Sequence, residues 1–98
     1  MLIYRGANIE ATYSNGWTPL HITCYNGNLS VVDMLISRGA NIDATYSNGW
    51  TLLHIACYNG HLSVVDILIS LGANIEAKYS NGLTPLDIAC NNGHLSVV

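Results

Sequence analysis

The chain repeats itself every 33 residues. The segment Gly-Ala-Asn-Ile stands at positions 6–9, 39–42 and 72–75, and residues 16–48 differ from residues 49–81 at only seven positions. A period of this length is typical of a solenoid, in which each unit buries its apolar face only against its neighbours. The sequence therefore predicts a stack of similar units that presents an extended surface.

Each unit predicts two short helices. Thr18 can cap the start of the first helix, Pro19 suits its first turn, and Gly27 can adopt the left-handed conformation that ends it. The second helix is expected from about Leu29 to Arg38, because apolar residues recur there at helical spacing over a wide arc. Gly39 is expected to stop this helix.

The segment that follows the second helix predicts a hairpin. The helical period is lost from Ala40 onward, and the segment ends in a Tyr-Ser-Asn-Gly turn at residues 46–49. Asn-Gly favours tight turns because both residues tolerate a positive φ. The expected unit is therefore helix, turn, helix and projecting hairpin. Helices this short are marginal alone in water, so stacking of the units must stabilise them.

Three segments carry a family resemblance. Residues 18–21, 60–65 and 72–75 resemble the T-P-L-H, G-H-x-x-V-V and G-A-D-V segments of the ankyrin repeat. The resemblance covers essentially the whole chain and implies an all-α ankyrin-repeat solenoid of stacked helix-turn-helix units with projecting β-hairpin loops. It divides a single array, residues 1–98, into a partial repeat (1–12), two repeats (13–45 and 46–78) and a second partial repeat (79–98).

Composition narrows the classes of partner. The chain has three basic and six acidic residues, with a formal net charge of −3. A surface that neutralises phosphates needs clustered lysine and arginine, so neither nucleic acid nor a membrane is expected as a partner. No apolar run has the length of a membrane span, and residues 1–9 lack the apolar core of a signal peptide. We therefore expect an intracellular, cytoplasmic protein, with the nucleus left open.

The histidines and cysteines do not predict a catalytic or metal site. His21 and Cys24, like His54 and Cys57, are three residues apart, but the third repeat has Asp87 in the histidine position. The same side chains recur at 33-residue spacing instead of converging as zinc ligands do. We predict no enzymatic activity, no cofactor and no metal. The histidines are expected to hydrogen-bond across repeats, and the cysteines to fill the core as unpaired thiols.

Positions at which the repeats differ carry two further expectations. His61 and His94 are expected to bond at the start of the second helix, where Asn28 serves in the first repeat. Leu52 stands where the other first helices begin with proline. If the backbone is the same, Leu52→Pro should stabilise the fold by about 0.4 to 1 kcal/mol by restricting the unfolded chain.

The family resemblance also implies a partner-binding face, built from the hairpin tips, the first helices and the residue before the terminal glycine of the second helix. Tryptophan and tyrosine, which dominate interface energetics, occupy several of these positions. The implied contacts form three rows: Ser14, Asn15, Trp17, Tyr25, Asn26 and Arg38; then Thr45, Ser47, Asn48, Trp50, Tyr58, Asn59 and Leu71; then Lys78, Ser80, Asn81, Leu83 and Asn91.

Two functions fit this sequence. The first is a non-catalytic protein–protein interaction module that binds a partner protein of unknown identity through hairpin tips and the concave helix face. It predicts that Trp17, Trp50, Tyr25 and Tyr58 are substantially exposed, whereas packing of the tryptophans against the neighbouring hairpin is the alternative. The second is a structural spacer segment of a longer ankyrin array, with any catalytic or membrane domain elsewhere. Near-identity of the copies at surface positions favours the spacer.

The two ends of the sequence carry a last expectation. Residues 1–5 align with the end of a second helix, and Val97 and Val98 align with the middle of another. Neither end shows the polar outer face of a capping repeat. We therefore expect apolar faces at both ends and end-to-end self-association.

Overall fold

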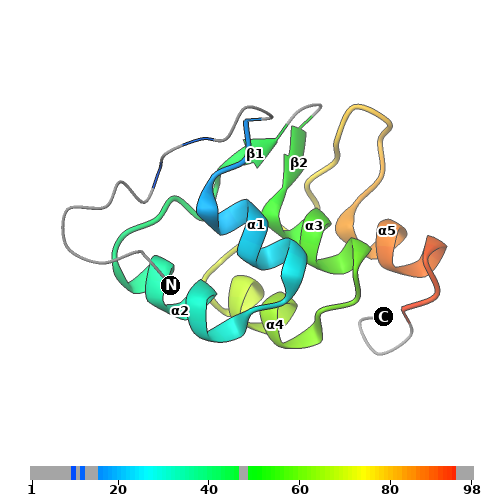
Figure 1. Ribbon diagram of the computed structural model, residues 1–98. Helices are drawn as coiled ribbons and strands as arrows, with labels where there is room; N and C mark the ends of the chain where they lie inside the picture. The colour runs from blue at the N-terminus through cyan, green and yellow to red at the C-terminus, as the bar shows by residue number, and fades with distance from the viewer. Residues whose placement is uncertain (1–9, 11, 13–15, 47–48, 95–98) are drawn as a thin grey trace.

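The computed structural model describes residues 10, 12, 16–46 and 49–94 of the chain (Figure 1). Within these residues the chain forms five helices and one two-stranded hairpin. In chain order they are α1 (Pro19–Asn26), α2 (Leu29–Ser37), β1 (Thr45–Tyr46), β2 (Trp50–Thr51), α3 (Leu52–Tyr58), α4 (Leu62–Ser70) and α5 (Pro85–Asn91). The expected order of helix, turn, helix and hairpin is confirmed.

A threonine caps the start of α1, α3 and α5. The φ and ψ angles are −84° and 167° at Thr18, −87° and 169° at Thr51, and −85° and 166° at Thr84. Each hydroxyl accepts the backbone N–H three residues on, and the side chain at that position bonds back to the threonine N–H. This reciprocal capping satisfies two donors that have no partner within the helix. The chain therefore enters all three helices alike, although Leu52 replaces proline in α3.

Glycines end α1 and follow α2 as the sequence predicts. Gly27 has a φ of 72°, in the left-handed region. Gly39 has a φ of 90° and follows Arg38, which caps α2. Helix α2 therefore ends at Ser37, one residue earlier than expected. The left-handed turn at Gly27 lies between α1 and α2, which run antiparallel (Figure 1).

The short hairpin lies between α2 and α3. Strands β1 and β2 pair antiparallel, with Thr45 opposite Thr51 and Tyr46 opposite Trp50. The corresponding loop of the next repeat closes with two backbone bonds, from Tyr79 N–H to the Leu83 carbonyl (3.3 Å) and from Gly82 N–H to the Tyr79 carbonyl (2.7 Å). The projecting hairpin expected in each repeat is thus present in β1–β2 and in a less regular form before α5.

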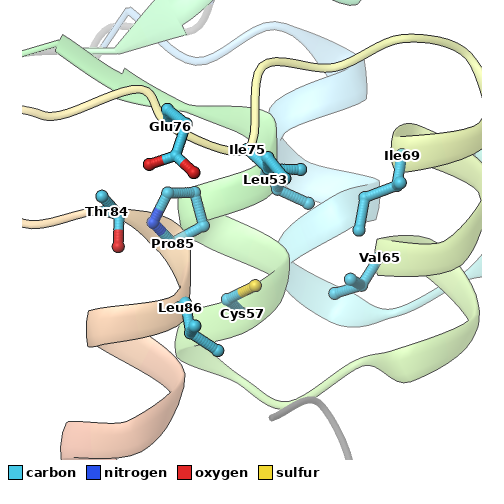
Figure 2. Close-up of a pocket in the computed structure, with 9 residues that line it drawn as sticks. All are labelled: Leu53, Cys57, Val65, Ile69, Ile75, Glu76, Thr84, Pro85 and Leu86. Atoms are coloured by element: carbon cyan, nitrogen blue, oxygen red, sulfur yellow. The ribbon is translucent and has the colours of Figure 1, made fainter.

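The helices form two layers. Helices α1, α3 and α5 lie side by side in one layer, and α2 and α4 lie beside each other in the second (Figure 1). Each helix of a layer contacts the next one along the chain, as expected of a solenoid. Where α3, α4 and α5 meet, side chains from all three helices line an open hollow (Figure 2).

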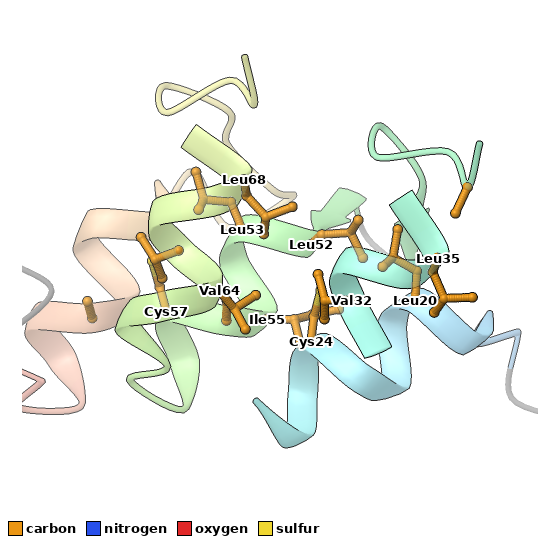
Figure 3. Close-up of a cluster of buried hydrophobic side chains, with 14 residues drawn as sticks. Leu20, Cys24, Val32, Leu35, Leu52, Leu53, Ile55, Cys57, Val64 and Leu68 are labelled. Carbon is orange, nitrogen blue, oxygen red and sulfur yellow. The ribbon is translucent and has the colours of Figure 1, made fainter. Parts of the chain in front are cut away.

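The core fills the space between the two layers (Figure 3). Leu20, Leu35, Leu52, Ile55 and Leu68 are each at most 2% exposed. These residues come from four different helices, so no helix has a core of its own. Because apolar burial is the main stabilising term, neighbouring repeats stabilise each other.

The three cysteines are free, as expected, but only two fill the core. Cys24 and Cys57 are buried, whereas Cys90 on α5 is exposed. The expectation of a buried thiol is therefore wrong for Cys90, which lies on α5, the last helix of the described residues, so that no later described helix packs against it. Burial raises the pKa of Cys24 to about 12 and that of Cys57 to about 11. Both thiols stay protonated near neutral pH, which makes them poor nucleophiles.

Candidate partner-binding surface

Fourteen of the eighteen predicted contact residues lie within the described chain; Ser14, Asn15, Ser47 and Asn48 lie outside it. The fourteen are spread over the hairpins, the first helices and the residues that follow the second helices. The exposed ones include Tyr25, Asn26, Arg38, Thr45, Tyr58, Leu71, Lys78, Ser80, Asn81 and Asn91. Trp17, Trp50, Asn59 and Leu83 are half-buried.

Two aromatic clusters dominate this surface. In the first, the Trp17 ring lies 5.5 Å from Tyr25 and 5.3 Å from Tyr46, with interplanar angles of 72° and 71°. In the second, the Trp50 ring lies 5.7 Å from Tyr58 at 68° and 5.2 Å from Tyr79 at 56°. Tilted and edge-to-face contacts of this kind are the favourable arrangement of aromatic pairs. Each tryptophan thus joins its own first helix to the hairpin of the following repeat.

The tyrosines and tryptophans differ in exposure. Tyr25 and Tyr58 are each 45% exposed, whereas Trp17 and Trp50 pack against the hydrophobic core. The expectation of substantial exposure is confirmed for the two tyrosines. It is wrong for the tryptophans, because Tyr46 and Tyr79 from the following hairpins cover one side of each indole.

Side chains of the next repeat fix the backbone at both exposed tyrosines. The Tyr25 carbonyl accepts bonds from Asn59 Nδ2 (2.8 Å) and His61 Nε2 (2.9 Å). The Tyr58 carbonyl accepts the equivalent bonds from Asn92 (2.9 Å) and His94 (2.8 Å). One predicted contact residue, Asn59, therefore uses its amide within the scaffold.

The expected capping role is wrong for His61, whereas the helix start that His94 would cap lies outside the described residues. Asn28 does accept the Val31 N–H at 3.4 Å, but His61 makes no side-chain bond to the start of α4. Its ring instead lies over Gly27, where an added Cβ would come within 2.5 Å of Nδ1. The His61 ring therefore leaves no room for a side chain at position 27. The local sequence does not predict this contact, because His61 and the Tyr25 carbonyl that it bonds are 36 positions apart.

Buried histidines hold the first helices and hairpins together. His54 is wholly buried; its Nδ1 accepts the Thr51 N–H at 3.2 Å, and its Nε2 donates to the Leu83 carbonyl at 2.9 Å. Burial lowers the pKa of His54, and the bond to Leu83 opposes this shift only in part. The bond across repeats that the sequence predicts is confirmed here. For His21, Nε2 is buried without a partner among the described residues.

The third row of the surface has a different character. Leu83 and Asn91 replace the aromatic residues, and Asp87 replaces the buried histidine. Asp87 is exposed, and its carboxylate accepts the Thr84 N–H at 3.0 Å, which lowers the pKa of the carboxyl group. The aromatic character is therefore confined to the first two rows.

Neither a metal-ligand cluster nor a membrane-spanning helix is found among the described residues. No three potential metal-ligating side chains come together in residues 10, 12, 16–46 and 49–94. Over the same residues, no helix is long and apolar enough to cross a bilayer. The faces expected to mediate self-association, at residues 1–5 and 97–98, lie outside this part of the chain, so that expectation stays a prediction.

Comparison with known proteins agrees with the architecture. A family model described as ankyrin repeats (3 copies) matches residues 1–79 and 48–98. A search of curated proteins finds no match. Ankyrin repeats are generally protein–protein interaction modules and are typically non-catalytic. The family match spans the chain, and the stacked helix pairs, the hairpin and the threonine-capped first helices agree with it, so the chain belongs to the ankyrin-repeat family.

Proposed function

We propose that this chain is a non-catalytic interaction module that binds a partner protein through its hairpin tips and the face that carries Tyr25 and Tyr58. The observation that supports this most directly is the repetition of an exposed tyrosine packed edge-on against a tryptophan, on two helices in contact. Large exposed aromatic side chains are costly to leave in water and are the side chains that most often dominate binding energy.

The fixed backbone at the tyrosines favours binding. Two hydrogen bonds from the following repeat hold each tyrosine carbonyl, and the tryptophan restrains each ring. A side chain already held in place loses little conformational entropy when a partner covers it. The same contacts therefore stabilise the stack and prepare its surface for association.

The chemistry of this face points to a partner surface with few charges. Tyr25, Tyr58 and the half-buried tryptophans contribute apolar area, while Asn26 and Asn91 contribute amide groups. Since association would depend on aromatic burial and amide hydrogen bonds, we expect its affinity to change little between low and moderate salt.

A photocrosslinking experiment tests the location of the binding face. Tyr58 is replaced by p-benzoylphenylalanine, which keeps an aromatic ring at this position. The matched control carries the same amino acid at Leu62, which is 41% exposed on α4. The proposal predicts crosslinks to the same partner from position 58 and not from position 62. Equal crosslinking from both positions, or crosslinking from position 62 alone, would contradict it.

A structural spacer is the second candidate, and one observation favours it. Trp17 and Trp50 contact the next hairpin, and the bonds to both tyrosine carbonyls join successive repeats, so much of this face stabilises the array itself. A spacer predicts that truncating Tyr58 lowers the stability of the fold without weakening any association. The crosslinking pair separates the two candidates, because a spacer gives no position-specific product.

A further inference from the structure

Asparagine followed by glycine occurs six times in this chain, in the hairpin loops and at the ends of the first helices. The backbone nitrogen of the glycine can attack the side-chain amide carbon of the asparagine, because glycine has no side chain that hinders the approach. The described residues contain four complete pairs, which begin at Asn26, Asn59, Asn81 and Asn92. The structure holds these four pairs in two different ways.

Three of the pairs lie at the ends of α1, α3 and α5. In each of them the glycine donates its backbone N–H to the carbonyl of the cysteine three residues earlier, at 3.1 to 3.3 Å. Two of the asparagine side chains are held as well. Nδ2 of Asn59 donates to the Tyr25 carbonyl at 2.8 Å, and Nδ2 of Asn92 donates to the Tyr58 carbonyl at 2.9 Å. Attack at Asn59 or Asn92 therefore requires a helix end to open and a bond between repeats to break.

The pair Asn81-Gly82 lies instead in the loop before α5, and both of its residues are exposed. Backbone bonds from Gly82 N–H to the Tyr79 carbonyl (2.7 Å) and from Tyr79 N–H to the Leu83 carbonyl (3.3 Å) close this loop. Nδ2 of Asn81 donates to the Tyr79 hydroxyl at 3.2 Å within the same loop. Segments held by a few exposed hydrogen bonds open at a low cost in free energy. The Gly82 nitrogen can thus become available without the opening of a helix.

A following repeat would leave this position accessible. Gly49 is the counterpart of Gly82 one repeat earlier, and the Cα of Tyr79 lies 3.6 Å from a Cβ added at Gly49. Gly49 is nevertheless exposed. Exposure alone does not distinguish the pairs either, because Asn92 is exposed as Asn81 is. The difference is the hydrogen bond that holds the Asn92 amide to the preceding repeat.

We propose that Asn81 is a site of spontaneous deamidation through a succinimide formed with Gly82. The Gly82 nitrogen loses its proton and bonds to the side-chain amide carbon of Asn81. The bond from that carbon to Nδ2 breaks, and the nitrogen takes up the proton and leaves as ammonia. Water then opens the ring at either carbonyl, which gives aspartate or isoaspartate at position 81. The net reaction takes up water and releases ammonia, so it needs no further reactant.

Either product changes the loop. A carboxylate replaces the amide, so position 81 gains a negative charge and can no longer donate to the Tyr79 hydroxyl. Isoaspartate also lengthens the backbone before Gly82 by a methylene group, which disturbs the bonds that close the loop. Because Tyr79 covers one side of Trp50, the change reaches the second aromatic cluster. An effect on partner binding rests on the proposed function, whereas the reaction itself does not.

Site-resolved peptide mapping tests the proposal on the whole chain without a partner. The folded chain is incubated at mildly alkaline pH, which favours the deprotonated glycine nitrogen, and conversion at each asparagine is followed over time by tandem mass spectrometry. Asn59 and Asn92 are the matched controls, because they belong to the same dipeptide. We expect Asn81 to convert at least about tenfold faster than either, since the free energy of opening adds to the barrier at the two controls.

Two further measurements guard the interpretation. In guanidinium chloride the three sites should react at rates within about threefold of one another, because the dipeptide is the same and no fold protects it. The variant Asn81→Gln should lose the product at position 81, since glutamine would have to form a larger ring. Digestion in heavy-oxygen water marks any conversion that takes place after the incubation.

Three results would overturn the proposal. The first is equal rates at Asn59 and Asn81 in the folded chain. The second is an unchanged Asn81 in the folded chain over a time in which the unfolded chain reacts at all three sites. The third is aspartate without isoaspartate at position 81, because opening of a succinimide gives both products. None of these outcomes depends on whether the aromatic face binds a partner.

Discussion

His54 donates from Nε2 to the carbonyl of Leu83, 29 residues further along the chain, at 2.9 Å. Its other ring nitrogen accepts the Thr51 N–H at 3.2 Å, so the ring is held as the neutral tautomer with its proton on Nε2. Protonation of Nδ1 would turn this acceptor into a donor facing another donor. The charge state of one buried side chain thus affects the helix cap at Thr51, while Nε2 keeps its proton and its bond to the next repeat.

Acid should therefore destabilise the fold. Burial lowers the pKa of His54 and His21 below the usual 6.5. A histidine whose pKa is lower in the folded than in the unfolded state stabilises the fold fully at pH values above its unfolded pKa of about 6.5. This contribution to the free energy of unfolding is lost as the pH falls below that value. We expect the urea concentration at the midpoint of unfolding to be lower at pH 5 than at pH 7.5.

The variant His54→Gln isolates this effect. Glutamine can complete the cap at Thr51, but it neither titrates nor reaches the Leu83 carbonyl as the imidazole does. We expect a loss of about 1 to 2 kcal/mol at pH 7.5, typical of a lost buried hydrogen bond, and a smaller decrease in stability toward pH 5. An unchanged pH dependence would show that His54 does not contribute to the acid sensitivity.

Two glycines with nearly the same backbone provide a test of the distance between repeats. Gly60 has a φ of 70° and an added Cβ would come within 2.5 Å of the His94 ring, whereas Gly93 has a φ of 74° and no described atom within 4 Å. Alanine at either position should cost about 1 to 2 kcal/mol for the left-handed backbone. Gly60→Ala should cost about 1 kcal/mol more, because His94 must leave the Tyr58 carbonyl. Equal urea midpoints for the two variants would contradict this account.

Leu52→Pro should destabilise the protein, contrary to the expectation from sequence alone. The backbone at Thr51 matches that at Thr84, so proline fits and still gains about 0.4 to 1 kcal/mol from restriction of the unfolded chain. However, Leu52 is 1% exposed within the core, and loss of its methyl groups leaves a cavity that outweighs this gain. We expect a net loss of about 1 kcal/mol by urea unfolding.

Leu52→Ala is the control for this substitution. Alanine removes the same buried methyl groups but does not restrict the unfolded chain as proline does. Leu52→Ala should therefore lower the free energy of unfolding more than Leu52→Pro. A proline variant that is less stable than the alanine variant would show that proline does not fit the start of α3.

Truncation of the aromatic residues should affect stability according to their burial. Tyr58 is 45% exposed, so Tyr58→Ala should cost only about 1 kcal/mol, mostly from the contact with Trp50. Trp50 is half-buried against Tyr79 and the core, so Trp50→Ala should cost about 2 to 3 kcal/mol. Urea unfolding measures both. A larger loss for Tyr58→Ala than for Trp50→Ala would favour the spacer.

The sequence predicts those features that depend on neighbouring residues. The caps at Thr18 and Thr84 and the left-handed Gly27 follow from local backbone chemistry. The roles of His61 and Trp50 do not, because their partners Tyr25 and Tyr79 come from other repeats and only stacking brings them close. For the same reason, the sequence identifies the aromatic positions of the candidate binding face but not which of them the stack itself covers.

The side-chain hydrogen bonds that Glu10, His54, Asn59, His61, Asn92 and His94 make to neighbouring repeats join residues 29 to 36 positions apart. The loop that must close before such a bond forms therefore has the same modest length in each repeat, and its entropy cost grows only slowly with loop length. The sequence separation of these contacts does not grow as repeats are added, so relative contact order, which slows folding when it is high, falls with each added repeat. Folding can start in any repeat and spread to the repeats on both sides. Further repeats would therefore add stability to the array without slowing the formation of the folding nucleus.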